Sequence, residues 1–128
     1  MDDSEHETSW TAAHAARRER DYDIALEAYE RCIALAQQDH WCEREVEARL
    51  FAAVCARHMG LSESNEAHLH AAVATARQRG LEQLLARALG ELGTLAVLKG
   101  HVGMGAAWYQ EALEIAQRIK DLRTAATQ

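Results

Sequence analysis

The fold is decided by residues 81–120, which read LEQLLARALGELGTLAVLKGHVGMGAAWYQEALEIAQRIK. Apolar side chains recur in this stretch every three or four residues, which is the spacing of a helix with one buried face. Gly100 interrupts the pattern near its middle, and a glycine readily adopts the left-handed conformation that ends a helix. The pattern therefore predicts two helices, at about residues 81–99 and 102–120, joined by a short turn.

The pattern occurs three times along the chain, with a period of 40 residues and no gaps. Tyr29 aligns with Leu69 and Tyr109 across the three copies. A contact repeated between packed helices requires small or apolar side chains at fixed positions, so the period indicates a helical repeat. Four further sets of aligned positions are small or apolar in every copy: Ala16, Ala56 and Ala96; Cys32, Ala72 and Ala112; Ile33, Val73 and Leu113; and Ala36, Ala76 and Ala116.

The first two copies predict four more helices from the same spacing. Polar residues stand where they can cap helix N-termini: Ser4 with Glu7 as a capping box, and Asp21 and Ser62 as single caps. The expected ranges are about 5–19, 22–38, 41–59 and 63–79, with Gly60 and Gly80 at two of the ends.

These helices predict an all-α fold, an α-solenoid of three antiparallel helix pairs in a single domain over residues 1–128. Of the 128 residues, 26 are alanine and none is proline, and aromatic residues make up only 5%. Small side chains let paired helices approach closely, and the shortage of aromatic residues argues against a sheet. The expected repeats cover about residues 5–40, 41–80 and 81–120, with a short tail at 121–128.

The sequence also indicates where the protein works. The N-terminus is acidic and polar, unlike a secretory signal, and no stretch approaches the ~20 apolar residues of a membrane span. The three cysteines, Cys32, Cys42 and Cys55, form no CxxC motif, and their odd number does not suit a disulfide framework. We therefore expect a cytoplasmic protein that does not contact a membrane.

The charge of the chain argues against nucleic acid as a partner. The formal net charge is −6, and residues 1–40 carry ten acidic and four basic residues. Nucleic-acid affinity comes mainly from neutralising phosphates, and the sequence has no basic stripe with interleaved aromatic residues. We expect no nucleic-acid binding.

Catalytic and cofactor motifs are missing as well. The glycine cluster GHVGMG at residues 100–105 lacks the lysine and the preceding strand of a phosphate-binding loop. Cys55 and His58 share a helix face and could begin a metal site with His68 and His70, but residues two apart on a helix point in nearly opposite directions. We expect neither an enzyme nor a cofactor or a metal site.

The third copy resembles the tetratricopeptide repeat family. The positions that carry this resemblance are Leu89, Leu92, Gly93, Ala96, Gly100, Gly105, Tyr109 and Ala112. The first copy is similar in its second helix, through Ala25, Tyr29 and Cys32, whereas the middle copy has Asn65 where the family usually has alanine. The family unit has about 34 residues, so the period of 40 resembles the subgroup with longer helices.

The resemblance, which covers about residues 8–120, implies a partner-binding groove, because the first helix of each pair lines the concave face in that family. The first helix carries Glu7, Trp10, His14, Arg17 and Arg18 at the family's groove positions. The second such helix carries Glu47, Leu50, Val54, Arg57 and His58. The third carries Arg87, Gly90, Thr94, Val97 and Leu98.

This groove implies a non-enzymatic protein–protein interaction module, an adaptor or a chaperone-like holder. We expect Trp10 and Leu50 to supply apolar contacts and Arg17 and Arg57 to select acidic side chains of a bound protein or peptide segment. Two alternatives stay open: the arginines are ordinary solvated charges, or the chain is a small regulatory sensor that binds a small ligand or metal in the groove. Family members that grip chaperone C-termini use lysine and asparagine where this chain has Trp10 and His14, so that function is not expected.

The end of the chain predicts a second contact surface. A solenoid must cover the apolar face of its last helix, and too few residues follow residue 120 to form a full capping helix. Uncovered apolar side chains with an additional tryptophan are typical of a protein contact. We expect a homodimer or partner contact through Trp108, Ile115, Ile119 and Leu122; the alternative is that the tail folds back over them.

Overall fold

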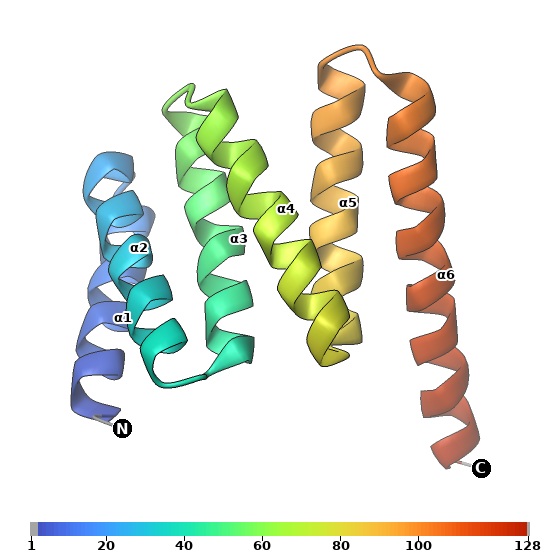
Figure 1. Cartoon of the computed structure of the whole chain (residues 1–128), viewed down its shortest axis with the longest axis horizontal. Coiled ribbons are helices and arrows are strands. Elements are labelled where there is room, and N and C mark those ends of the chain that lie inside the picture. The colour runs from blue at the N-terminus through green and yellow to red at the C-terminus, as the bar shows by residue number, and fades with distance from the viewer. Residues whose placement is uncertain (1–2, 128) are drawn as a thin grey trace.

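The computed structural model describes residues 3–127, and over these residues it is entirely helical, without a strand. The all-α prediction is therefore confirmed (Figure 1). The six helices are α1 (Asp3–Arg18), α2 (Tyr22–Gln38), α3 (Cys42–His58), α4 (Ser62–Arg79), α5 (Glu82–Leu98) and α6 (Val102–Thr127).

The helices lie in a row in the order of the chain, and the chain reverses direction at each turn (Figure 1). Each helix packs mainly against the helices that precede and follow it in the sequence. As a result, α1 and α6 stand at the two ends of the row, and each of them has one side without a neighbouring helix.

All five turns have one geometry, repeated every 20 residues. The residue at the end of each turn has a positive φ, and the next N–H donates to an alanine carbonyl five residues back, at 2.8–2.9 Å. This is the Schellman arrangement, which satisfies carbonyl groups at a helix C-terminus. Gly60, Gly80 and Gly100 occupy three of the positive-φ positions, as predicted, but Arg20 and His40 occupy the other two.

The predicted N-terminal caps are wrong. Asp21 precedes α2 but makes no side-chain cap, because its ψ of 69° differs from the extended backbone from which a side chain reaches the first-turn amides. Ser62 lies inside α4, after Leu61, and Ser4 lies inside α1. The Schellman turn sets the backbone at these positions, so the helices start without the side-chain caps.

Two core clusters hold the row together. One is centred on Tyr29 and joins α1, α2 and α3. The other, around Leu69 and Leu89, joins α3, α4, α5 and α6. Because alanines dominate both clusters, the helices approach closely and the larger side chains fill the spaces between them.

Glycines allow the closest helix approach, between α5 and α6. A Cβ added to Gly105 would lie 2.7 Å from Val97 Cγ2, and one added to Gly93 would lie 2.9 Å from the Tyr109 ring. Both distances are shorter than real Cβ contacts, so these positions require glycine for the crossing.

The last helix is longer than expected. The prediction ended it near residue 120 and left residues 121–128 as a separate tail, but α6 continues without a break to Thr127. Residues 121–127 contain neither glycine nor proline to stop the helix. The tail therefore does not fold back over α6.

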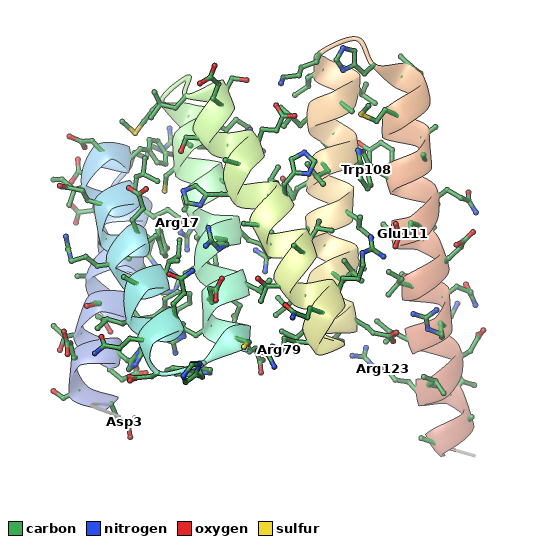
Figure 2. All side chains as sticks on the ribbon, in the orientation of Figure 1. Asp3, Arg17, Arg79, Trp108, Glu111 and Arg123 are labelled. Carbon is green, nitrogen blue, oxygen red and sulfur yellow. The ribbon has the colours of Figure 1, made fainter. Side chains whose placement is uncertain are left out.

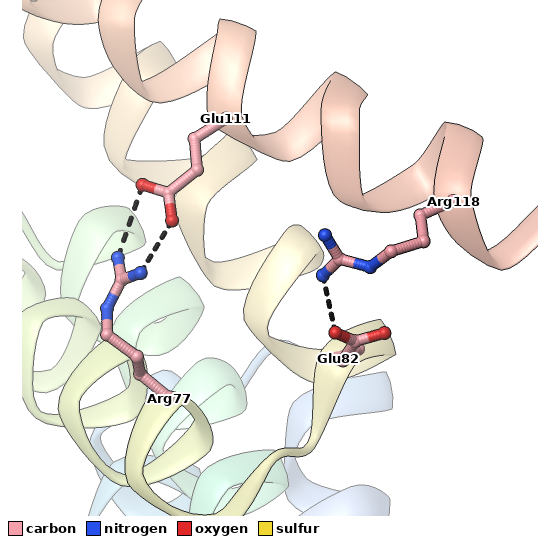
Figure 3. Close-up of polar contacts among 4 residues, drawn as sticks. All are labelled: Arg77, Glu82, Glu111 and Arg118. Atoms are coloured by element: carbon pink, nitrogen blue, oxygen red, sulfur yellow. Dashed lines mark hydrogen bonds and ion pairs between the residues drawn. The ribbon is translucent and has the colours of Figure 1, made fainter.

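Ion pairs fasten α6 to the helices before it. Arg77 of α4 donates two hydrogen bonds to the Glu111 carboxylate, at 2.6 and 3.2 Å, and Arg118 donates one to Glu82 of α5 (Figure 3). All four side chains are at least one-third exposed, so these pairs orient α6 more than they stabilise it. Over the described residues, none of the six helices has a long enough apolar stretch to cross a membrane.

Candidate functional site

The candidate site is centred on Phe51 of α3, which sequence reasoning missed. Its half-buried ring stacks on Tyr29 of α2, with centroids 5.3 Å apart and planes within 14°. The rings of Trp10 and His14 from α1 meet it edge to face, at 5.8 and 5.0 Å. These four side chains form the aromatic cluster. Phe51 is the only phenylalanine of the chain, and that was the available signal.

Two arginines from different helices lie against this ring. The guanidinium carbon of Arg17 lies 4.7 Å from the Phe51 centroid, and that of Arg87 lies 5.4 Å from it. A guanidinium over an aromatic face is attracted by the ring quadrupole. Residues that are far apart in the sequence thus form one cationic surface on α1, α3 and α5.

The charges of these two arginines are not neutralised within the described part of the chain. No carboxylate there lies within ion-pair distance of Arg17 or Arg87. Other arginines of the protein do have carboxylate partners: Arg44, Arg49, Arg57, Arg77 and Arg118 pair with Glu7, Glu45, Glu91, Glu111 and Glu82. In a protein with a net charge of −6, this surface is therefore a local exception.

A hydrogen-bond chain orients Arg17. Its Nε donates to the Tyr29 hydroxyl at 3.0 Å, and that hydroxyl lies 2.6 Å from His14 Nδ1. Burial lowers the pKa of His14, and the nearby Arg17 and Arg18 lower it further. Burial raises the pKa of Tyr29. His14 is thus held neutral, and Arg17 keeps its other N–H groups directed away from this chain of bonds.

A second guanidinium supports the edge of the aromatic cluster. Arg44 lies between Trp10 and Trp41, 4.2 Å from each ring, and its Nη2 lies 3.5 Å from a Glu7 oxygen. Its Nη1 is buried and makes no hydrogen bond. The sequence contained no signal for Arg44 or Trp41, because only the fold brings α1 against the start of α3.

The groove residues predicted on α3 divide between core and surface. Leu50 is only 2% exposed, which corrects its expected role as a partner contact: it points into the core beside Val46 and Ala53. Val54 is half-buried. Arg57 is exposed but pairs with Glu91 at 3.6 Å, and His58 stacks on Tyr22 at 4.3 Å.

The remaining predicted residues lie mostly on the surface. On α1, Arg18 and Glu7 are exposed. Burial and the neighbouring Glu43 raise the pKa of Glu47 on α3. The Thr94 hydroxyl lies 2.7 Å from that of Tyr109 and donates to the Gly90 carbonyl, Val97 packs on Gly105, and Leu98 is highly exposed.

The contact surface predicted on α6 also requires a correction. Ile115 is 4% exposed, because it packs into the core beneath α5. Trp108 and Ile119 are half-buried against the same core, and only Leu122 is fully accessible. The open face of α6 therefore consists of other residues than those expected.

Metal ligands do not gather in the described part of the chain: no three histidine, cysteine or acidic side chains there could hold an ion. Cys55 is buried, and its burial raises the pKa of the thiol, whereas His58 faces Tyr22. Cys55 and His58 are therefore both engaged in packing.

Comparison with known proteins adds no family assignment: no protein-family model matches the chain, and no curated protein does.

Proposed function

We propose that this protein is a non-enzymatic helical-repeat module, similar to the tetratricopeptide repeats, which binds an acidic segment of a partner protein on the surface around Phe51. In this proposal the three antiparallel helix pairs form a short right-handed solenoid, and the module acts in the cytoplasm as an adaptor or chaperone-like holder. The supporting observation is that Arg17 and Arg87 both lie against Phe51 and neither has a carboxylate partner in the described chain.

The chemistry of this surface favours a carboxylate-bearing partner. A guanidinium can donate two parallel hydrogen bonds to one carboxylate, and such charge-assisted bonds are about twice as strong as neutral ones. Phe51 and Trp10 are half-buried and held by neighbouring rings, so they offer apolar contact area with little loss of side-chain freedom. A segment that alternates acidic and apolar side chains would match both features.

The test uses a fluorescent peptide that alternates glutamate and leucine, with a lysine–leucine peptide as the probe of opposite charge. We expect the acidic peptide to bind the wild type, and the Arg17→Glu, Arg87→Glu double variant to bind it about tenfold more weakly. Added salt should weaken the wild-type complex as well.

The matched control reverses two exposed charges elsewhere, Arg79→Glu and Arg123→Glu. Arg79 lies at the far end of α4 and Arg123 near the end of α6, both away from Arg17 (Figure 2). The control changes the net charge by the same amount and should keep the wild-type affinity. Equal loss in both double variants, or no loss in the first, would reject a specific site around Phe51.

A further inference from the structure

The 40-residue period shows which face of α6 lacks a neighbour. Ile33 of α2 and Val73 of α4 are 6% and 8% exposed, whereas the aligned Leu113 of α6 is 64% exposed. The difference arises because α3 covers α2 and α5 covers α4, but no helix follows α6. Three further α6 residues are exposed although their counterparts in α2 are buried. They are Ala106, Tyr109 and Ala116, aligned with Leu26, Tyr29 and Ala36. With Leu113, these residues form the open α6 face.

The first helix has a complementary open face, found by the same comparison. Ala48, Ala52 and Cys55 of α3 are buried, because α3 packs on α2 through them. The aligned residues of α1 are Thr8, Ala12 and Ala15, and all three are exposed. They lie on one side of α1, at the spacing of a helix face, and form the open α1 face.

The two open faces match in register. Where α3 packs on α2, Ala48, Ala52 and Cys55 share a core cluster with Ile33, Tyr29 and Leu26. The 40-residue period carries this interface onto the two ends of the row. In the transferred interface Thr8 lies opposite Leu113, Ala12 opposite Tyr109, and Ala15 opposite Ala106.

Charges at the ends of these helices are also complementary. The first turn of α1 is acidic, with Asp3 and Glu5. The late turns of α6 carry Arg118, Lys120 and Arg123. Asp3 and Arg123 lie toward the same edge of the row of helices (Figure 2). A second copy placed next in the row would therefore bring its acidic α1 start beside the basic end of α6.

We propose that the protein self-associates head to tail, with the open α1 face of one copy on the open α6 face of the next. The contact repeats the packing that already joins α2 to α3, and its occupant is a second copy of this chain. A head-to-tail contact leaves one open face of each kind at the ends, so the assembly grows beyond a dimer unless its rotation closes it. A symmetric contact of α6 with α6 would instead stop at two copies.

Sedimentation of single variants and of their mixture tests this assignment. Ala12→Arg blocks the α1 face and Leu113→Arg blocks the α6 face, and both residues are exposed, so the fold tolerates the changes. We expect the wild-type mass to rise past twice 14.3 kDa with concentration, and each variant alone to stay monomeric. The equimolar mixture should form a dimer and stop there, because each variant supplies the face that the other has lost.

The controls place arginine on exposed positions outside both faces, Ala74→Arg and Leu98→Arg, and should associate like the wild type. Circular dichroism of every variant checks the helix content. Association of Ala12→Arg at wild-type strength would overturn the proposal in favour of a symmetric α6 contact. A mixture that stays monomeric, or a wild type that stays monomeric at all concentrations, would overturn it too.

Discussion

His14 Nδ1 accepts a hydrogen bond from the Tyr29 hydroxyl, with 2.6 Å between the two atoms. The direction follows from Arg17, whose Nε donates to the same hydroxyl and leaves its single proton for His14. The imidazole must therefore be neutral at Nδ1, in agreement with the lowering of its pKa by burial and by nearby arginines. This bond fastens α1 to α2 inside the aromatic cluster.

The neutral state of His14 predicts a loss of stability in mild acid. Because the folded protein holds the His14 pKa below 6.5, the unfolded chain binds this proton first as the pH falls. The free energy of unfolding should decrease as the pH falls through about 6.5, and the loss should level off below the folded-state pKa. Burial and Arg49 lower the pKa of His68 as well, so it adds a loss of the same sign.

Urea unfolding at pH 7.5 and pH 5.5 measures this effect. His14→Gln keeps a polar side chain and should reduce the difference in unfolding free energy between the two pH values. The control Ala34→Gln places the same side chain on an exposed part of α2 and keeps both histidines. Equal pH dependence in His14→Gln and the wild type would contradict this account of His14.

The turns predict two stabilising substitutions. Arg20 and His40 have φ values of 63° and 56°, in the left-handed region that costs an ordinary residue about 1–2 kcal/mol. Glycine avoids that cost but loses about 0.5–1 kcal/mol through its freer unfolded chain. Arg20→Gly and His40→Gly should therefore each raise the unfolding free energy by up to about 1 kcal/mol in urea titrations. Arg31→Gly, inside α2, should lower it by about 1 kcal/mol; a loss in all three variants would contradict the turn geometry.

The crossing of α5 and α6 predicts opposite effects for two glycine-to-alanine substitutions. At Gly105 the new Cβ would lie 2.7 Å from Val97 Cγ2 and 3.0 Å from the Gly93 carbonyl, so the helices must separate. We expect Gly105→Ala to lower the unfolding free energy by about 1–3 kcal/mol. Gly90→Ala meets nothing within 4 Å and should raise it by about 0.5–1 kcal/mol. Thermal unfolding of both variants decides the point, and a stabilised Gly105→Ala would show that the crossing has more space.

The ion pair between Arg77 and Glu111 predicts a weak coupling that responds to salt. Arg77 lowers the pKa of the Glu111 carboxyl through its hydrogen bonds, but both side chains are largely in water. A double-mutant cycle with Arg77→Gln and Glu111→Gln should give a coupling of about 0.2–1 kcal/mol, reduced at high salt. A coupling well above that range would mean that the pair is shielded from solvent.

The helices could be predicted from the sequence because their signals are local. Apolar spacing identifies a buried face, and the phase of Gly60, Gly80 and Gly100 marks three of the turns. The end of α6 was missed because the prediction relied on the period, whereas residues 121–127 contain no residue that stops a helix. Turn residues Arg20 and His40 carried no such signal, since neither favours a positive φ.

The candidate site was predicted only in part. Trp10, His14 and Arg17 do lie at its centre, but Leu50 was chosen where Phe51 takes part. Neighbouring residues on a helix point about 100° apart, so an error of one position separates the surface from the core. Arg57 was expected to act beside Arg17, but its pairing with Glu91 on α5 could not be read from either residue alone.

By itself, the sequence determined that this chain forms six helices in three similar copies, because apolar spacing and glycine phase act within a single helix and its turn. Only the tertiary structure decided which charges stay unpaired and which faces stay open. Those properties depend on side chains from different helices: Arg17 and Arg87 meet at Phe51, while α1 and α6 each lack one neighbour. Such contacts join residues more than 30 positions apart, and their geometry is set by how closely the alanine-rich helices pack.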